Sequence, residues 1–363
     1  MTTDTEPKAP AGPLPVVFDG HNDVLLRLYR SEDEADPARL FFERQPNGHI
    51  DMQRAEEGRF GGGFFAVYIP SDPADPPPPP DPDTDDEELP PPLGLVYSQR
   101  IAMGIMALLF QLERKSDERL KVVRTAGELQ TCLQNGVTAA ILHFEGAEPI
   151  DINLDALEVF YQAGLRSLGP VWSRPNPFAE GVPFRFPHSP DTGPGLTDAG
   201  LALVKACNSL GIMVDLSHLN EQGFWDVART TTAPLVATHS NAHALCQATR
   251  NLTDKQLDAI RESDGMVGVN FAVSFLREDG KSNRDTPLEV ILRHLDYLVE
   301  RLGMDRVGFG SDFDGATMPS EIGDVAGLPK LLGALRAHGY SDTELRKLAH
   351  ENWVRVLRKT WGK

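Results

Sequence analysis

The sequence predicts an α/β protein folded as a single-domain, TIM-like (β/α)8 barrel, and three observations predict this class. Short apolar runs alternate with amphipathic segments along the 363 residues of the chain. The apolar runs are nearly continuous, which is typical of parallel strands that are buried on both faces. Ionisable side chains follow several of these runs, and such barrels carry their active sites at the carboxyl ends of the strands.

Eight of the apolar runs have the length and composition of buried strands. They are residues 15–19, 63–69, 137–143, 165–171, 212–217, 234–238, 266–271 and 306–310. Strands that alternate with helices in this way favour a closed barrel. A doubly wound sheet is the competing fold, but no Gly-rich phosphate loop follows the first strand.

Helices are predicted between most of the strands from amphipathic periodicity and from capping residues. The predicted helical segments are residues 97–115, 154–163, 197–211, 253–265, 286–303 and 341–360. Thr253 and Ser341 each begin a capping box, in which a side chain three residues later returns the hydrogen bond. Thr286 is expected to cap its helix, with Pro287 at the first helical position.

Two segments stand outside the barrel pattern. Residues 71–92 hold ten prolines and eight acidic residues, so they predict an extended surface insertion within the domain rather than a helix or strand. Residues 1–14 are expected to be a flexible leader, and they lack the apolar core of a secretory signal. No run of about 18 apolar residues indicates a membrane span. A cytoplasmic protein without a membrane partner is therefore expected.

The composition excludes several classes of function. The formal net charge of −18 argues against a nucleic-acid partner, because phosphate binding needs a basic surface. The cysteines Cys132, Cys207 and Cys246 are far apart and odd in number, so they predict neither a disulfide framework nor a cysteine metal site. No GxSxG motif indicates a nucleophilic serine.

Candidate metal ligands gather at the carboxyl ends of five predicted strands. They are His21, Asp23, Glu145, His218, His239 and Asp312. Residues i and i+2 of an extended chain point to the same side, so His21 and Asp23 can bind one ion. Imidazole and carboxylate together suit zinc or a similar divalent metal. Singly, Asp312 could be a turn former and His218 a strand-end hydrogen-bonding residue, but the complete set favours a metal site.

Six segments resemble the membrane (renal) dipeptidase family, the M19 peptidases of the amidohydrolase superfamily. The segments are DGHNDVLLRL, HFEGAEPI, VDLSHLN, ATHSNAHALCQATRNLTDKQLDAI, GMVGVNF and VGFGSDFDGA. They occur in the family's order and span nearly the whole chain apart from the leader and the insertion. The resemblance implies a soluble, bacterial-type barrel that holds two Zn²⁺ ions and hydrolyses dipeptides, often with a D-residue at the C-terminal position. Family members are often dimers, so a homodimer is a candidate assembly.

The resemblance also implies roles for the ligand residues. His21 and Asp23 would bind one zinc ion. His218 and His239 would bind the other, and Glu145 would bridge the two. Two such ions lower the pKa of a shared water, so that a metal-bridging hydroxide would attack the dipeptide carbonyl.

Three further positions match the family pattern or depart from it. Asp312 would lie beside the water and the substrate's amino end, and would carry the water's proton to the leaving amine. Arg250, eleven residues after His239, matches the arginine that binds the substrate's C-terminal carboxylate. Trp172 stands where mammalian members carry a histidine that helps to polarise the scissile carbonyl, and an indole cannot be cationic. A metal ion, Arg174 or a backbone amide is the candidate substitute for that histidine.

Two other functions stay open at this point. Another binuclear-metal amidohydrolase, acting on a cyclic or N-acyl amide, would use the same metal ligands. A catalytically silent, metal-free binding barrel would be expected to have lost a ligand, and none is lost. The side chains accepted at the two dipeptide positions are not predicted, although Arg174 and Arg185 hint at an acidic substrate side chain.

Overall fold

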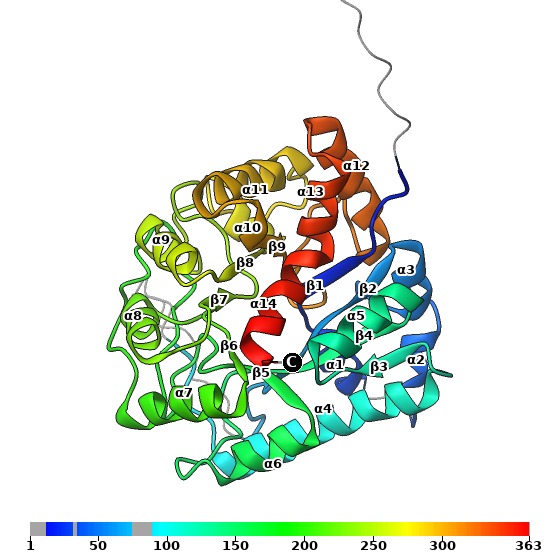
Figure 1. Ribbon diagram of the computed structural model, residues 1–363. Coiled ribbons are helices and arrows are strands. Elements are labelled where there is room, and N and C mark those ends of the chain that lie inside the picture. Colours follow the sequence, from blue (N-terminus) through cyan, green and yellow to red (C-terminus); the bar gives the residue numbers. More distant parts are fainter. Residues whose placement is uncertain (1–11, 32–34, 75–88, 363) are drawn as a thin grey trace, which may run out of the picture.

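The computed structural model describes residues 12–31, 35–74 and 89–362, which form a parallel barrel surrounded by helices (Figure 1). Most of the predicted insertion at 71–92 and most of the predicted leader at 1–14 lie outside the described residues. Figure 1 looks onto the end of the barrel that the C-terminal helix covers.

The described residues contain nine strands, and all of the ladders between them are parallel. The strands are β1 (Val17–Asn22), β2 (Phe60–Tyr68), β3 (Leu120–Val122), β4 (Thr138–Glu145), β5 (Leu165–Gly169), β6 (Met213–Val214), β7 (Val236–Ala237), β8 (Met266–Val269) and β9 (Val307–Phe309). They run in the order β6-β5-β4-β2-β1-β9-β8-β7, and β3 pairs with β4 outside this path. A parallel bridge between Asp215 and Val236 joins the two ends of the path. The predicted eight-stranded barrel is therefore confirmed, with β3 as an unpredicted addition.

Each predicted helical segment is helical in the structure. The helices are α1 (Val24–Tyr29), α2 (Arg39–Phe42), α3 (Met52–Glu57), α4 (Leu95–Lys115), α5 (Ala126–Asn135), α6 (Asp155–Ala163), α7 (Asp198–Leu210), α8 (Glu221–Thr230), α9 (Asp254–Glu262), α10 (Val273–Leu276), α11 (Leu288–Leu302), α12 (Leu328–His338), α13 (Asp342–Arg346) and α14 (Asn352–Trp361). The cap predicted at Thr286 is wrong. Pro287 is itself the N-cap residue, and the Thr286 hydroxyl donates instead to the Asn283 carbonyl at 2.6 Å. A π-helical turn, Lys347–Glu351, separates α13 from α14.

Helix α4 lies along the outside of the barrel and has 21 residues (Figure 1). Within the described part of the chain, it is the one helix that is long and apolar enough to cross a membrane. A helix that packs into a protein core passes the same test, and α4 buries Ile101, Ile105 and Leu109 in the hydrophobic core. Its other side exposes Val96 and Met103.

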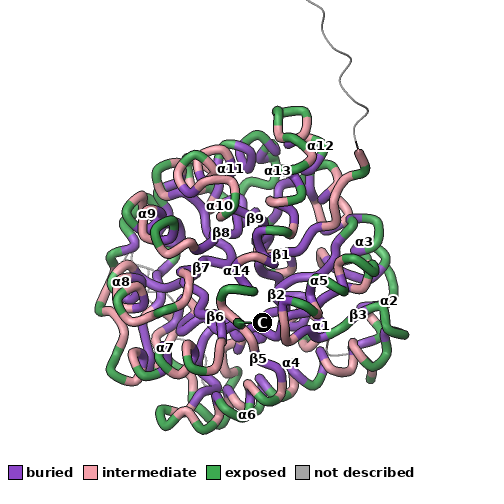
Figure 2. Tube along the Cα trace, in the orientation of Figure 1, coloured by how far each residue is buried: buried purple, intermediate pink, exposed green. Residues whose placement is uncertain are grey.

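Helix α14 lies among strands that are buried along most of their length (Figure 2). Its Trp353 is fully buried and fills the amino-terminal end of the barrel interior. Its Nε1 donates to the Phe309 carbonyl at 3.1 Å, and its ring centroid lies 5.1 Å from that of Phe64. Gly20 and Gly308 make room for the indole, because a Cβ on either would lie less than 3.0 Å from it. The carboxyl-terminal end of the barrel is thus left to form the site.

Trp353→Ala is expected to lower the free energy of unfolding by about 3–5 kcal/mol, because the substitution leaves a cavity that the barrel cannot close. Denaturant unfolding followed by circular dichroism measures the loss. Trp361→Ala is the matched control in the same helix, since Trp361 is only partly buried and bonds the Arg166 carbonyl near the surface. Equal losses in the two variants would contradict the filling role of Trp353.

Candidate metal centre

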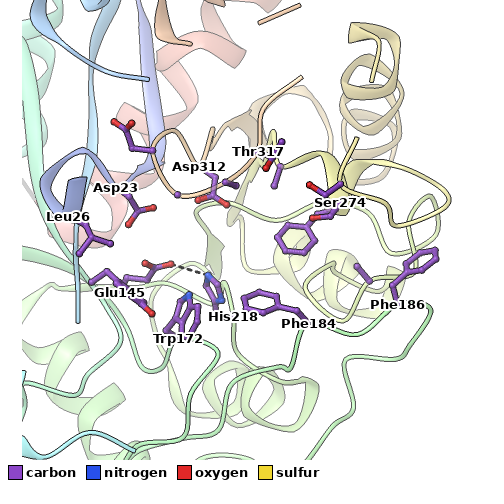
Figure 3. A pocket seen from close by; sticks show the side chains of 18 of the residues that line it. Asp23, Leu26, Glu145, Trp172, Phe184, Phe186, His218, Ser274, Asp312 and Thr317 are labelled. Carbon is purple, nitrogen blue, oxygen red and sulfur yellow. Dashed lines mark ion pairs between the residues drawn. The ribbon is translucent and has the colours of Figure 1, made fainter. Parts of the chain in front are cut away.

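The predicted ligands meet at the carboxyl ends of the barrel strands, where Figure 3 shows Asp23, Glu145, His218 and Asp312. The Nε2 atoms of His21, His218 and His239 lie 3.6, 3.0 and 3.6 Å from the same atom, Glu145 Oε1. Asp23 Oδ2 lies 3.3 Å from His21 Nε2. Residues from four parts of the chain therefore converge on one small volume, as the barrel geometry requires.

The rings of His218 and His239 face each other across this volume. Their Nε2 atoms are 3.1 Å apart, and each Nδ1 contacts a hydroxyl, from Ser173 at 3.0 Å and from Thr238 at 2.8 Å. Burial is the main cause that keeps the pKa of both histidines well below the ordinary value. When each Nδ1 carries the ring proton, both Nε2 lone pairs point into the same space. A bound cation stabilises that arrangement.

The carboxylates of Asp23 and Glu145 lie close to His21. Burial alone would lower its pKa, but Glu145 and Asp23 outweigh burial and raise the pKa to about 10. The ligand atoms of His21, Glu145 and His239 lie within 4.8 Å of one another, and those of His21, Asp23 and Asp312 form a second such group. These nitrogen and oxygen donors fit zinc or a similar divalent ion, which would replace the proton on His21.

Asp312 follows β9 and lies beside Asp23 at the rim of the site (Figure 3). Asn270 Nδ2 donates to Asp312 Oδ2 at 2.9 Å, and burial raises the pKa of the Asp312 carboxyl. Asp312 and His218 have φ angles of 65° and 68°, which are uncommon for residues other than glycine and gather at functional sites. A Cβ on Gly315 would lie 2.1 Å from Asp23 Oδ2, so the turn after β9 needs glycine there.

A pocket of about 520 Å³ opens above these groups (Figure 3). Its polar lining includes Asp23, Glu145, His218 and Asp312, and its aromatic lining includes Tyr68, Trp172, Phe184 and Phe275. The ring centroid of Trp172 lies 5.8 Å from that of His218 and 5.0 Å from that of Tyr68. Pockets of this size hold small molecules, and aromatic walls with a few polar groups fix their orientation.

Arg250 lies behind the pocket wall. Its Nη2 donates to the His239 carbonyl at 3.1 Å, and its guanidinium lies 5.4 Å from the ring centroid of Phe275, which lines the pocket. The side chain is buried, and its Nε has no hydrogen-bond partner among the described residues. A buried donor left in this way is costly unless a ligand satisfies it.

Arg174 is not among the residues that line the pocket, and the roles suggested for it by the sequence stay predictions. Its guanidinium is buried, donates to the Ile69 carbonyl at 3.0 Å and lies 3.6 Å from Glu148. Burial raises the pKa of Glu148 to about 7, and the Arg174 charge opposes that rise. Arg174 therefore pairs with a buried carboxylate, that of Glu148, beside the site. Arg185, in contrast, lines the pocket.

Sequence reasoning missed the polar residues that support the ligands. They are Ser173, Asp215, Thr238 and Asn270. For two of them the sequence did carry a signal, which was closeness to a predicted ligand. Thr238 directly precedes His239, and Asp215 lies three residues before His218. Proximity alone does not say which side chain donates to which.

A parallel (β/α)8 barrel with histidines and carboxylates clustered at its strand ends is typical of metal-dependent hydrolases. The sequence profile of the membrane dipeptidase family, peptidase family M19, matches residues 14–361. The chain belongs to this family, and it is an enzyme that hydrolyses peptide bonds.

Two solved structures and one sequence relative illustrate the match. A metallo-dipeptidase of family M19, dipeptidase AC, is 55% identical with a TM-score of 0.91, covering 97% of this chain and 100% of that one. A Rhodobacter sphaeroides metallopeptidase, solved with a phosphinate mimic of L-Ala-D-Ala, is 53% identical with a TM-score of 0.90, covering 96% and 100%. An uncharacterised Klebsiella pneumoniae protein from the pqqA 5′ region is 53% identical over 256 residues, which are 70% of this chain and 94% of that protein.

Proposed function

We propose that this protein is a zinc-dependent dipeptidase that hydrolyses small dipeptides, including L-Xaa-D-Xaa, at a binuclear metal centre. The observation that carries the proposal is the convergence of three histidine Nε2 atoms on Glu145 Oε1 at the floor of a small pocket. The dipeptide mimic bound by the Rhodobacter sphaeroides relative supports the substrate class.

In this proposal His21 and Asp23 hold one divalent ion. His218 and His239 hold the other, and Glu145 contributes to both. Two bound divalent ions lower the pKa of water toward neutrality and polarise a carbonyl oxygen. The chain contributes buried ligands whose positions are fixed by strand ends, so little reorganisation is needed when the substrate arrives.

Three residues of the chain act on the substrate in this proposal. Asp312 accepts the proton of the attacking water and delivers it to the leaving amine, while Asn270 holds its Oδ2. In this proposal the Arg250 guanidinium, which lies against the Phe275 ring of the pocket wall, binds the substrate's C-terminal carboxylate and so selects dipeptides over longer peptides. Trp172 bounds the pocket where the family histidine would stand, and its indole offers one neutral donor.

Asp312→Asn is expected to lower kcat by about 10²- to 10⁴-fold, because an amide cannot accept and return a proton. Metal content is expected to stay at the wild-type level. Asp314→Asn is the control two residues away, since the Asp314 carboxylate is engaged by Arg27 at 3.1 Å and by the His49 amide at 2.6 Å. Rates and metal content are measured on both variants. A D312N enzyme with full activity would remove the proton-transfer role.

The proposed function is tested by metal analysis together with a substrate panel. Purified protein is assayed for zinc and for cleavage of L-Xaa-D-Xaa dipeptides, L-Xaa-L-Xaa dipeptides, cyclic amides and N-acyl amides, before and after chelation. About two metal ions per chain with chelator-sensitive cleavage is the expected result. If the protein binds metal but cleaves only cyclic or N-acyl amides, those amides rather than dipeptides are its substrates. Absence of bound metal would overturn the proposed binuclear centre.

A further inference from the structure

A buried carboxylate lies directly behind His239, on the side away from the pocket. Asp215 follows β6, and its side chain is only 2% exposed. Its Oδ1 accepts the backbone N–H of Thr238 at 2.8 Å and that of Ser217 at 3.0 Å. Its Oδ2 accepts the Thr238 hydroxyl at 2.5 Å, and the same hydroxyl oxygen lies 2.8 Å from His239 Nδ1.

Counting hydrogens fixes the direction of this chain of contacts. A carboxylate only accepts, and a threonine hydroxyl has one proton to donate. That proton goes to Asp215 Oδ2, so Thr238 Oγ1 must accept from His239. The ring proton of His239 therefore resides on Nδ1, and the lone pair of Nε2 points toward Glu145 Oε1 and the Nε2 of His218.

We propose that Asp215 is a positioning residue for the metal centre, acting on His239 through the hydroxyl of Thr238. We call the hydrogen bonds from His239 to Thr238 and from Thr238 to Asp215 the relay. The relay holds the His239 imidazole in the tautomer that a metal ligand requires and fixes the direction of its Nε2 lone pair. It rests on the proposed function in that His239 is taken as a metal ligand.

Asp215 also lies at the seam where β6 meets β7, so a purely structural role has to be separated from the relay. Asp215→Asn keeps the shape of the side chain and reverses the relay. The amide oxygen accepts the two backbone N–H groups, and the amide nitrogen then donates to Thr238 Oγ1. The hydroxyl proton then has no acceptor on residue 215 and can turn toward His239 Nδ1, which favours the tautomer with the ring proton on Nε2, the atom that should bind metal.

Zinc affinity of the metal-free protein is the readout, measured by competition with a chromophoric chelator. D215N is expected to bind zinc about 10- to 100-fold more weakly than the wild type at the site that contains His239. Thr238→Val removes the relay and is expected to show a similar loss, whereas Thr238→Ser keeps the hydroxyl and is expected to retain wild-type affinity. The melting temperature of each metal-free variant shows whether the seam is intact.

The outcomes separate this inference from the proposed function. Wild-type zinc affinity in both D215N and T238V would overturn the relay. If D215N does not fold, the T238V and T238S pair decides alone, and equal affinities in that pair would overturn the relay. A wild-type protein that binds zinc but cleaves no dipeptide would overturn the proposed function and leave the relay standing. A wild-type protein without zinc affinity would overturn both.

Discussion

Glu145→Gln is expected to lower kcat/KM for dipeptides by on the order of 10³-fold or more, and to reduce the bound metal from about two ions per chain toward one. Glu145 Oε1 lies within 3.6 Å of the Nε2 atoms of all three site histidines. Its negative charge is therefore close to both proposed ion positions, the one at His21 and the one at His218 and His239. Glutamine keeps the volume of the side chain but replaces an anionic oxygen with an amide that can donate. Metal analysis and steady-state kinetics on the same preparation measure both effects.

Glu148→Gln is the matched control for this substitution. Glu148 lies three residues further along the chain and is as buried as Glu145, at 4% exposed against 6%. Its carboxylate faces Arg174, at 3.6 Å, rather than the histidines. The variant is expected to keep the metal and to lose stability instead, because Arg174 would be left as an uncompensated buried charge. Full metal content in E145Q, or an equal loss of metal in E148Q, would contradict the bridging role.

The barrel could be predicted because its strands are buried on both faces and therefore appear as continuous apolar runs. β2 is such a run, and eight of its nine residues are buried. β3 could not be predicted in the same way. It has three residues, and Lys121 in the middle is exposed, so the segment resembles a loop in sequence. The cap at Thr286 failed for a related reason, because the choice between Thr286 and Pro287 depends on the loop that precedes α11.

The meeting of the ligand residues could be predicted because parallel barrel strands end at one rim. His21 and His239 are far apart in sequence, yet their rings stack with centroids 3.9 Å apart. The support of each ligand could not be predicted, because it depends on the register between neighbouring strands. The pairing of Asp215 with Val236 sets the Asp215 carboxylate against Thr238, and nothing in the motif VDLSH specifies that partner.

The surroundings of Arg174 could not be predicted from the sequence either. In sequence it lies in a polar segment beside the site, and its charge suggests a contact with the substrate. In the structure the buried Glu148 lies beside its guanidinium, and the Ile69 carbonyl accepts one of its donors. A partner that lies elsewhere in the chain thus decides whether a charged residue faces a ligand or the interior.

Arg250→Met is expected to lower kcat/KM for dipeptides by about 30-fold to several thousand-fold, because loss of one partner of a buried charge pair costs about 2–5 kcal/mol. Methionine keeps most of the packing under the Phe275 ring. The His239 carbonyl keeps a second donor in Asn270 Nδ2 at 3.5 Å, so the metal ligand is expected to stay in place. Metal content measured on the variant tests that expectation.

A dipeptide amide separates the two ways in which Arg250 can act. If its guanidinium binds the substrate carboxylate, the wild type cleaves the amide much more slowly than the free dipeptide, and R250M adds little further loss with the amide. If Arg250 acts by holding the His239 carbonyl, R250M impairs both substrates equally and metal affinity falls with activity. Arg250→Lys keeps the charge but not the two-pronged donor, so its kcat/KM for the free dipeptide is expected to lie between those of the wild type and R250M. The contact of the Arg250 guanidinium with the ring of Phe275, which lines the pocket, favours the first way.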